Sequence, residues 1–409
     1  MDSDILETID MKALGRELQQ ARIRKGLTQE DAAKIIEVAR TTMIAIEQGN
    51  RRIRARELIN LAHAYGLQVS DFVRPRPVLA MSQPQFRGPS LRTEEDNALI
   101  EPYVEQLKQL ARDYFELERI NEAPLIRKYA PEYNMGRLRT SDAAESIAIE
   151  ERMRLGLGDG PIPLLRDILE QDVGLRIFYY PLPAKFSAIY LYDDQVGGCI
   201  AVNVLHPEER RRWSLAHDYG HFLTYRHKPT VYIDEGYYLR KPESERLADD
   251  FATYFLMPTN GVTRRFNDIR RTKEKVKIAD LCNLAYYYGV SVEAMTRRLE
   301  DLKLLPTGLW DKIRASGFRV REAQEQLGLS ALPARDQKLP VRYQYLAIEA
   351  FDHGFISEGL LARFLDVDRL EARRIAEVLR QSATEGADAS FTDRDMAEPF
   401  SNWEDTVND

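Results

Sequence analysis

The chain has little cysteine, few histidines and no long apolar run. Only two cysteines, Cys199 and Cys282, occur among 409 residues, which excludes a disulfide framework and a cysteine-rich metal site. No stretch of about 18 or more apolar residues is present, so no membrane-spanning helix is expected. The start, MDSDILETIDMKALGREL, is acidic and amphipathic and has no apolar signal core. We therefore expect a cytoplasmic protein that does not enter a membrane, and the length predicts two to four compact units.

Positive and negative charges are nearly balanced over most of the chain. The net charge is −7, and residues 381–409 alone carry eight acids and one base. This last segment also has few large apolar residues, a composition typical of solvated chain. We therefore predict a flexible acidic tail at 381–409.

Two short helices are predicted within "LTQEDAAKIIEVARTTMIAIEQGNRR". Thr28 followed by Asp31 is typical of a helix start, and the first helix is expected to end near Ile35. A tight turn at 36–38 leads to a second helix at 39–47. An earlier helix has apolar side chains at Leu14, Leu18, Ala21 and Ile23 and is expected to end at Gly26. Two short helices joined by such a turn are the helix-turn-helix arrangement, whose second helix enters the major groove.

This region resembles the phage-repressor-type (Xre family) helix-turn-helix. The resemblance implies a five-helix, lambda-repressor-like domain at 1–75 that binds a double-stranded DNA operator, commonly as a homodimer. Its DNA-contacting residues would be Gln29, Arg40, Thr41, Thr42, Asn50, Arg51 and Arg52. Their chemistry agrees, because arginine and hydroxyl side chains bind base edges and basic loops neutralise phosphates. Two alternatives remain open: a helical protein-interaction module, or a degenerate fold that has lost DNA binding.

A linker and a long helix are predicted next. Four prolines and a glycine in 74–92 show no period, so we place a linker at 76–92. A connecting helix is expected at 93–139, starting at Thr93. Its apolar stripe has helical spacing and comprises Ile100, Val104, Leu107, Leu110, Tyr114 and Leu117.

Two histidines four residues apart in "SLAHDYGHFL" are candidate metal ligands. Residues at this spacing share one helical face, so His217 and His221 can bind one ion. In "ESERLADDFATYFLMP", Glu245 can supply a third ligand, and Asp249, one turn later, can hydrogen-bond a ligating histidine. Two histidines and one glutamate favour a catalytic-type Zn²⁺ site over an iron site. If the histidines are core residues, or if Glu245 pairs with Arg246 or Arg240, no metal is needed.

The motifs "IAVN", "RRRWSLAHDYGHFL" and "ESERLADDFATYFLMP" together resemble the ImmA/IrrE family of gluzincin-like metallopeptidases. In that family an edge strand precedes the metal-binding helix, and a small helical segment similar to 281–305 follows. The resemblance implies an α+β metallopeptidase domain at 140–305 that acts on a protein substrate. It assigns His217, His221 and Glu245 as ligands, and it places Asp249 behind them. Asp218 takes the position of the catalytic general base.

Asp218 is where this sequence departs from the family, which has glutamate at that position. Aspartate keeps the carboxylate but is shorter by one methylene, about 1.5 Å, and small displacements from productive geometry are costly in catalysis. General acid–base help is typically worth about 10²- to 10⁴-fold in rate. The sequence therefore allows two alternatives, a working peptidase or a metal site put to another use.

The remaining chain predicts further helices around a mainly α fold with a small β-sheet. Three strands are expected in "GLRIFYYPL" and "SAIYLYDD...GGCIAVN". A C-terminal helical domain is expected at 306–380, with two or three short helices between residues 343 and 379. Arg369, Arg373 and Arg374 would line its last helix. A second DNA reader is one interpretation, and the acidic neighbours Asp366, Asp368 and Glu371 favour a packing or partner-binding module.

The sequence supports one leading hypothesis for function and two alternatives. The leading hypothesis is a repressor-type transcriptional regulator with a zinc-metallopeptidase-like domain that senses or cleaves something. The first alternative is a zinc endopeptidase that cleaves a repressor or itself. The second is an antitoxin that autoregulates its operon and binds a toxin partner.

Overall fold

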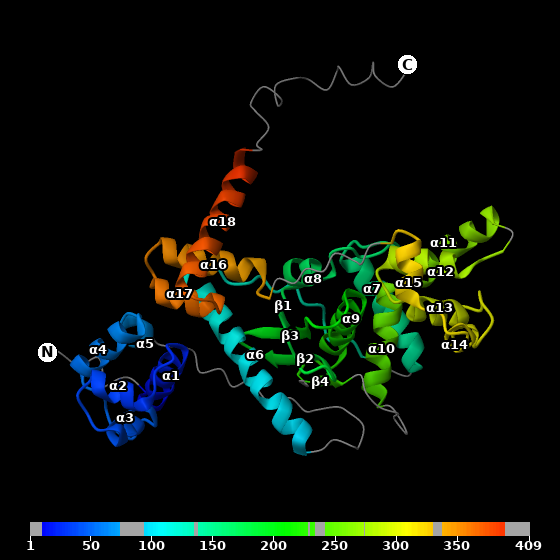
Figure 1. Cartoon of the computed structure of the whole chain (residues 1–409). Helices are drawn as coiled ribbons and strands as arrows, with labels where there is room; N and C mark the ends of the chain where they lie inside the picture. The colour runs from blue at the N-terminus through cyan, green and yellow to red at the C-terminus, as the bar shows by residue number, and fades with distance from the viewer. Residues whose placement is uncertain are drawn as a thin grey trace. The chain divides into compact units, whose positions relative to one another are not determined.

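The chain folds into two compact units, whose helices and strands are labelled in Figure 1. The computed structural model describes residues 10–73, 94–134, 138–227, 230–233, 242–273, 275–329 and 338–388. Unit 1 comprises Met1–Arg76 with Val341–Asp409, and unit 2 comprises Pro77–Pro340. The region predicted as one C-terminal domain, 306–380, is thus divided between the two units. The predicted linker, 76–92, and the predicted helix start at Thr93 lie outside the described residues.

Unit 1 begins with five short helices, as the sequence predicted: α1 (Met11–Arg24), α2 (Gln29–Ile35), α3 (Arg40–Glu47), α4 (Ala55–Tyr65) and α5 (Ser70–Val73). Thr28 caps α2 with the reciprocal hydrogen bonds of a capping box to Asp31. The apolar stripe of α1 is partly as expected. Leu14, Leu18 and Ala21 are buried in the core, but Ile23 is 59% exposed. Ile23 lies two positions after Ala21, about 200° around the helix, so it points away from the stripe.

Helices α1 and α3 approach closely at Gly15. A Cβ atom added to Gly15 would lie 2.5 Å from the backbone oxygens of both Ile46 and Glu47. No other residue type therefore fits between the two helices without a shift of backbone. This contact fixes α3, the helix predicted to enter the major groove, against the rest of the unit.

Three C-terminal helices complete unit 1: α16 (Val341–Asp352), α17 (Glu358–Leu365) and α18 (Arg369–Asp388). They contact the five N-terminal helices through polar groups. The Ser357 hydroxyl donates a hydrogen bond to Asp71 at 2.6 Å, and Arg363 pairs with Glu17 at 3.2 Å. Since α18 continues to Asp388, the first eight residues of the predicted flexible tail are helical. The rest, 389–409, lies outside the described residues.

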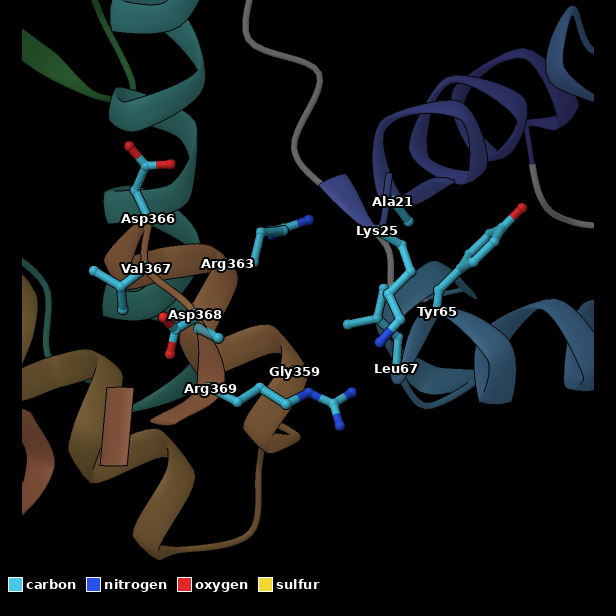
Figure 2. Close-up of a pocket in the computed structure, with 11 residues that line it drawn as sticks. Ala21, Lys25, Tyr65, Leu67, Gly359, Arg363, Asp366, Val367, Asp368 and Arg369 are labelled. Carbon is cyan, nitrogen blue, oxygen red and sulfur yellow. The ribbon is translucent and has the colours of Figure 1, made fainter. Parts of the chain in front are cut away.

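A cavity of about 630 Å³ lies between α1 and α4 on one side and α17 and the start of α18 on the other. Figure 2 shows Lys25, Tyr65 and Leu67 on the first side, with Arg363 and Arg369 on the second. Arg369 donates a hydrogen bond to the carbonyl oxygen of Gly66. The sequence-based interpretation of this last segment as a packing module agrees with these contacts.

Unit 2 is built on a four-stranded sheet in the order β1-β3-β2-β4. The strands are β1 (Arg176–Tyr180), β2 (Phe186–Asp193), β3 (Gly197–Asn203) and β4 (Thr230–Ile233). β1 runs parallel to β3, whereas β2 is antiparallel to both β3 and β4. The first three strands match the prediction, and β4 was missed. The expectation that an edge strand precedes the metal-binding helix is wrong. That strand, β3, lies inside the sheet, and β1 and β4 form the edges of the sheet.

Helices cover both faces of the sheet, so β3 is buried along its whole length. Alternate strand residues point to opposite faces. Ile177 and Ile200 join a core with α9 (Glu208–Thr224) and α10 (Glu243–Leu256). On the other face, Phe178 packs edge-on against Tyr114 of α6 (Glu94–Ile120), with ring centroids 6.3 Å apart. The predicted α6 stripe is confirmed, because all six of its apolar residues are buried.

The other helices of unit 2 pack around this layer. α7 (Thr140–Arg154) lies against α10, and the short α8 (Leu165–Ile168) continues into a π-helical turn at Leu169–Val173. Five more helices follow: α11 (Thr259–Thr272), α12 (Ile278–Tyr288), α13 (Val292–Asp301), α14 (Leu309–Ala315) and α15 (Val320–Gln326). Among the described residues, no helix is both long enough and apolar enough to cross a bilayer.

Candidate metal centre and nucleic-acid surface

The three predicted metal ligands converge on one point inside unit 2. The Nε2 atoms of His217 and His221 are 3.1 Å apart. Glu245 reaches them from α10, with Oε2 at 3.4 Å from His217 Nε2 and Oε1 at 3.2 Å from His221 Nε2. All three side chains are buried, and one ligand atom from each lies within 4.8 Å of the others. Three donors that face one another at this distance are the geometry that a divalent ion requires.

Helix α9 positions the two histidines because it starts after Pro207 and packs against α10. It begins after Pro207, whose extended backbone ends the preceding segment, and its residues 214–224 are all buried. One turn separates His217 from His221, so their rings share the face that meets α10. The competing pairing of Glu245 with Arg246 is not formed, since Glu245 contacts the two histidines instead. Arg240 lies outside the described residues.

Asp249 contacts His217 from behind, at the position that the sequence predicted for it. Its Oδ1 is 2.9 Å from Nδ1 of His217. A carboxylate accepts but does not donate, so Nδ1 carries the proton and the lone pair of Nε2 faces His221 and Glu245. A histidine held in this tautomer is ready to bind a metal ion through Nε2. The donor set therefore fits zinc.

Glu245 is ionised in this environment. Burial raises the pKa of its carboxyl group, but the adjacent His217 and His221 rings lower it by more, so the net pKa is well below the usual value. A negatively charged glutamate beside two imidazoles is the charge state of a zinc ligand set.

Asp218 is buried beside this centre, and unlike the three ligands it has no hydrogen-bonded side-chain partner among the described residues. Its side chain is 0% exposed, and neither carboxylate oxygen has a hydrogen-bond partner among the residues that the structure describes. Burial raises the pKa of Asp218 to about 7, and the His217 ring opposes the rise. Buried carboxylates normally have partners, so an acid of this kind is typical of a functional site rather than of packing.

A polar network behind α9 was missed at the sequence level. Glu151 of α7 is fully buried and accepts hydrogen bonds from Tyr219 and, at 2.9 Å, from Tyr133. Arg154 pairs with the same carboxylate at 2.7 Å. These contacts join α7 and the 121–134 segment to the helix that carries both histidines. No motif in the sequence marks Glu151, because its burial depends on residues about 70 positions away.

The predicted DNA-contacting residues of α3 are accessible. Arg40 and Thr41 are exposed at its first turn, and Thr42 is half-buried. The N-cap is Ala39, which makes no side-chain cap, so the first backbone N–H groups of the helix have no side-chain acceptor there. Such a helix start can approach a phosphate or a base edge.

The other predicted contacts are divided between the surface and the interior. Gln29 donates to Glu47 at 2.9 Å, and Glu47 also pairs with buried Arg22 at 2.6 Å, so the Gln29 amide stabilises the domain. Arg51 forms two hydrogen bonds with Glu57, at 3.0 and 2.8 Å. Asn50 donates to Gln48 at 3.1 Å and Arg52 is exposed. Of the predicted contacts that follow α3, Arg52 is therefore the arginine whose charge is exposed.

Comparison with known protein families supports both resemblances. A helix-turn-helix domain family matches residues 13–72, and a peptidase family described as the IrrE N-terminal-like domain matches residues 170–300. No curated protein matches the chain. The solved structure of Bacillus thuringiensis PlcR in complex with the peptide PapR7 and DNA is 12% identical, with 93% of this chain and 100% of that chain covered and a TM-score of 0.15. A likeness that weak carries no argument. The two family resemblances are confirmed by the domain matches alone.

Proposed function

This chain joins a helix-turn-helix domain to an IrrE N-terminal-like domain, and from that premise we propose that it is a repressor-type transcriptional regulator with a zinc-binding second unit. The proposal rests mainly on the exposed first turn of α3, with Arg40 and Thr41, followed by exposed Arg52. Arginine and hydroxyl groups there can bind base edges and phosphates. Helix-turn-helix domains of this type commonly bind as dimers to two half-sites about one DNA turn apart, and we propose a homodimer here.

Binding to the DNA upstream of the chain's own reading frame tests this proposal. We expect specific binding to that duplex, and we expect it to weaken steeply with salt. The double variant Arg40→Ala/Arg52→Ala should lose it. A matched variant, Arg373→Ala/Arg374→Ala, removes two exposed arginines of α18 and should retain it. Unchanged binding by the first variant would exclude the proposed surface.

Zinc in unit 2 is the second part of the proposal. His217, His221 and Glu245 would hold it, and a zinc ion bound there supplies Lewis acidity. Asp249 keeps the lone pair of His217 Nε2 available by accepting a hydrogen bond from Nδ1. Elemental analysis of the purified protein is expected to give one zinc per chain, and none in His217→Ala. A metal-free wild type would contradict this part and leave the DNA-binding part untouched.

Peptide cleavage is a candidate second function, favoured by the buried, unpartnered carboxylate of Asp218. Asp218 would take a proton from the attacking water and deliver it to the leaving amine nitrogen. The substrate would be a repressor or another copy of this chain. Cleavage should be abolished in His217→Ala and retained or increased in Asp218→Glu, which restores the longer side chain. If neither the wild type nor the Asp218→Glu variant cleaves a substrate, the site has a sensing or structural role and not a catalytic one. The antitoxin alternative stays a prediction.

A further inference from the structure

The most basic stretch of unit 2 lies outside the metal centre. Residues 264–277, RRFNDIRRTKEKVK, carry seven bases and two acids, a net charge of +5 in a chain whose total is −7. All seven bases are exposed: Arg264, Arg265, Arg270, Arg271, Lys273, Lys275 and Lys277. Two apolar residues of α11, Val262 and Phe266, are buried in the core and anchor the helix. Four of the bases are exposed on this helix, and Lys273, Lys275 and Lys277 follow its end at Thr272.

Most of these charges are not neutralised within the protein. Among the described residues, Arg264, Arg270 and Lys275 have no ion pair and no hydrogen-bond partner. Arg271 lies 3.8 Å from Asp268, and both side chains are more than half exposed, so water weakens that pair. Within the described part of the chain, Lys273 is the one base of the seven with a close acidic partner, Asp280. Unpaired cations concentrated along one short stretch of helix and the chain after it are typical of a site that binds an anionic polymer.

A cavity lies beside the basic stretch and includes some of its side chains in its lining. A cavity of about 590 Å³ lies between α11 and α12 and is lined by Arg265, Ile269, Lys273, Tyr286 and Tyr287, among others. The guanidinium of Arg265 lies 4.7 Å from the ring centroid of Tyr287, which is itself 43% exposed. The aromatic ring holds that guanidinium in place without neutralising it.

The adjacent helix pair cannot read base sequence. α12 and α13 are joined by a short turn at 289–291, which is the spacing of a helix-turn-helix. However, the second helix is buried on most of its surface, including Met295, Thr296 and Leu299. It has no free face to enter a major groove. Any nucleic-acid contact of this region is therefore with phosphates, through α11 and the chain that follows it.

We propose that residues 264–277 bind the phosphate backbone of duplex DNA as a second, sequence-independent contact. The proposal rests on the proposed function, because DNA held by the helix-turn-helix domain is tethered to the chain that carries this stretch, which raises the effective concentration of that DNA. Contacts of this kind add affinity and carry no sequence preference. An acidic polypeptide offers the same sign of charge, and it is tested below as the competing occupant.

The test compares two full-length variants that lose the same charge. One is Arg264→Gln/Arg270→Gln/Arg271→Gln. The control, Lys312→Gln/Arg314→Gln/Arg321→Gln, alters three exposed bases elsewhere in unit 2. Binding to a labelled duplex of arbitrary sequence is measured as a function of salt. Each lost phosphate contact lowers the slope of log K against log salt by about 0.9, so the first variant should lose about 2 to 3 and the control nothing.

Zinc content and circular dichroism establish that both variants are folded. Repeating the measurement in the Arg40→Ala/Arg52→Ala background separates this proposal from the proposed function, because the slope difference should persist there. Equal slopes in the two three-residue variants would overturn the proposal even if operator binding stands. Loss of polyglutamate binding with an unchanged DNA slope would also overturn it and would identify an acidic polypeptide as the partner.

Discussion

Both ring nitrogens of His217 contact a carboxylate, and these contacts determine how the metal centre should respond to mutation. Asp249 accepts a hydrogen bond from His217 Nδ1, with Oδ1 2.9 Å from that nitrogen, and Glu245 lies 3.4 Å from His217 Nε2. Removing the Asp249 carboxylate leaves the three ligands in place, but the His217 ring is then free to rotate and to carry its proton on either nitrogen. Contacts of this kind typically change metal affinity by about 10- to 100-fold. Asp249→Ala should therefore weaken zinc binding by that factor, measured by competition with a chromogenic chelator.

Two further variants make that measurement specific. Asp249→Asn keeps an acceptor oxygen without the charge, so its zinc affinity should fall between those of the wild type and Asp249→Ala. Glu243→Ala removes a carboxylate from the same helix that does not contact either histidine, and its affinity should be unchanged. Equal affinities in Asp249→Ala and Glu243→Ala would show that Asp249 does not position His217.

Neighbouring arginines of the helix-turn-helix domain should behave differently. Arg51 binds Glu57 through two hydrogen bonds, whereas Arg52 is exposed. Arg51→Ala should lower the free energy of unfolding by about 1 kcal/mol, because it leaves the largely buried Glu57 without that partner. Arg52→Ala should change it by less than about 0.5 kcal/mol but lower the salt slope of DNA binding by about 0.9. Urea unfolding and salt titration of binding measure the two effects, and a reversed order would contradict the assignment.

At the scale of helices, the position of α3 depends on a close contact with α1. A Cβ at residue 15 would meet two backbone oxygens at 2.5 Å. Gly15→Ala should therefore shift α1 from α3 and destabilise unit 1 by about 1 to 3 kcal/mol, with DNA affinity falling as a result. Gly160→Ala is the control, because a Cβ there has no atom within 4 Å. Thermal unfolding measures the stability of both variants. Equal midpoints would show that α1 and α3 can move apart without loss of stability.

Sequence patterns predicted the elements whose signals are local. The helices with clear caps or apolar stripes, such as α2, α3 and α6, form at the predicted places, although α6 ends at Ile120 and not at the predicted 139. The convergence of His217, His221 and Glu245 was predictable because two helix-borne motifs supply the ligands. Features set by distant contacts were not predictable. Arg22 is buried only because Glu47 comes from another helix, and β4 is a strand only because β2 offers an edge.

At the scale of the whole molecule, two compact units predict two separable unfolding transitions. Unit 1 is joined across the chain by the hydrogen bond from Ser357 to Asp71 and the pair of Arg363 with Glu17. Unit 2 contains the proposed zinc ligands on α9 and α10. A ligand stabilises only the unit that binds it, by about 2.7 kcal/mol at a free concentration 100 times its Kd. Excess zinc should therefore raise one transition alone, and the rise should be absent in His221→Ala.

The other transition should respond to the polar contacts of unit 1. Ser357→Ala leaves a buried Asp71 oxygen without its hydroxyl donor, so the free energy of unfolding of unit 1 should fall by about 1 kcal/mol. Calorimetry of the full chain with and without zinc measures both effects. Ser316→Ala, whose hydroxyl bonds only within its own helix turn in unit 2, serves as the control. If zinc and Ser357→Ala instead move a single shared transition, the two units unfold cooperatively. A signal at the metal centre could then alter DNA binding through stability alone, because the helix-turn-helix domain would share the free energy of zinc binding.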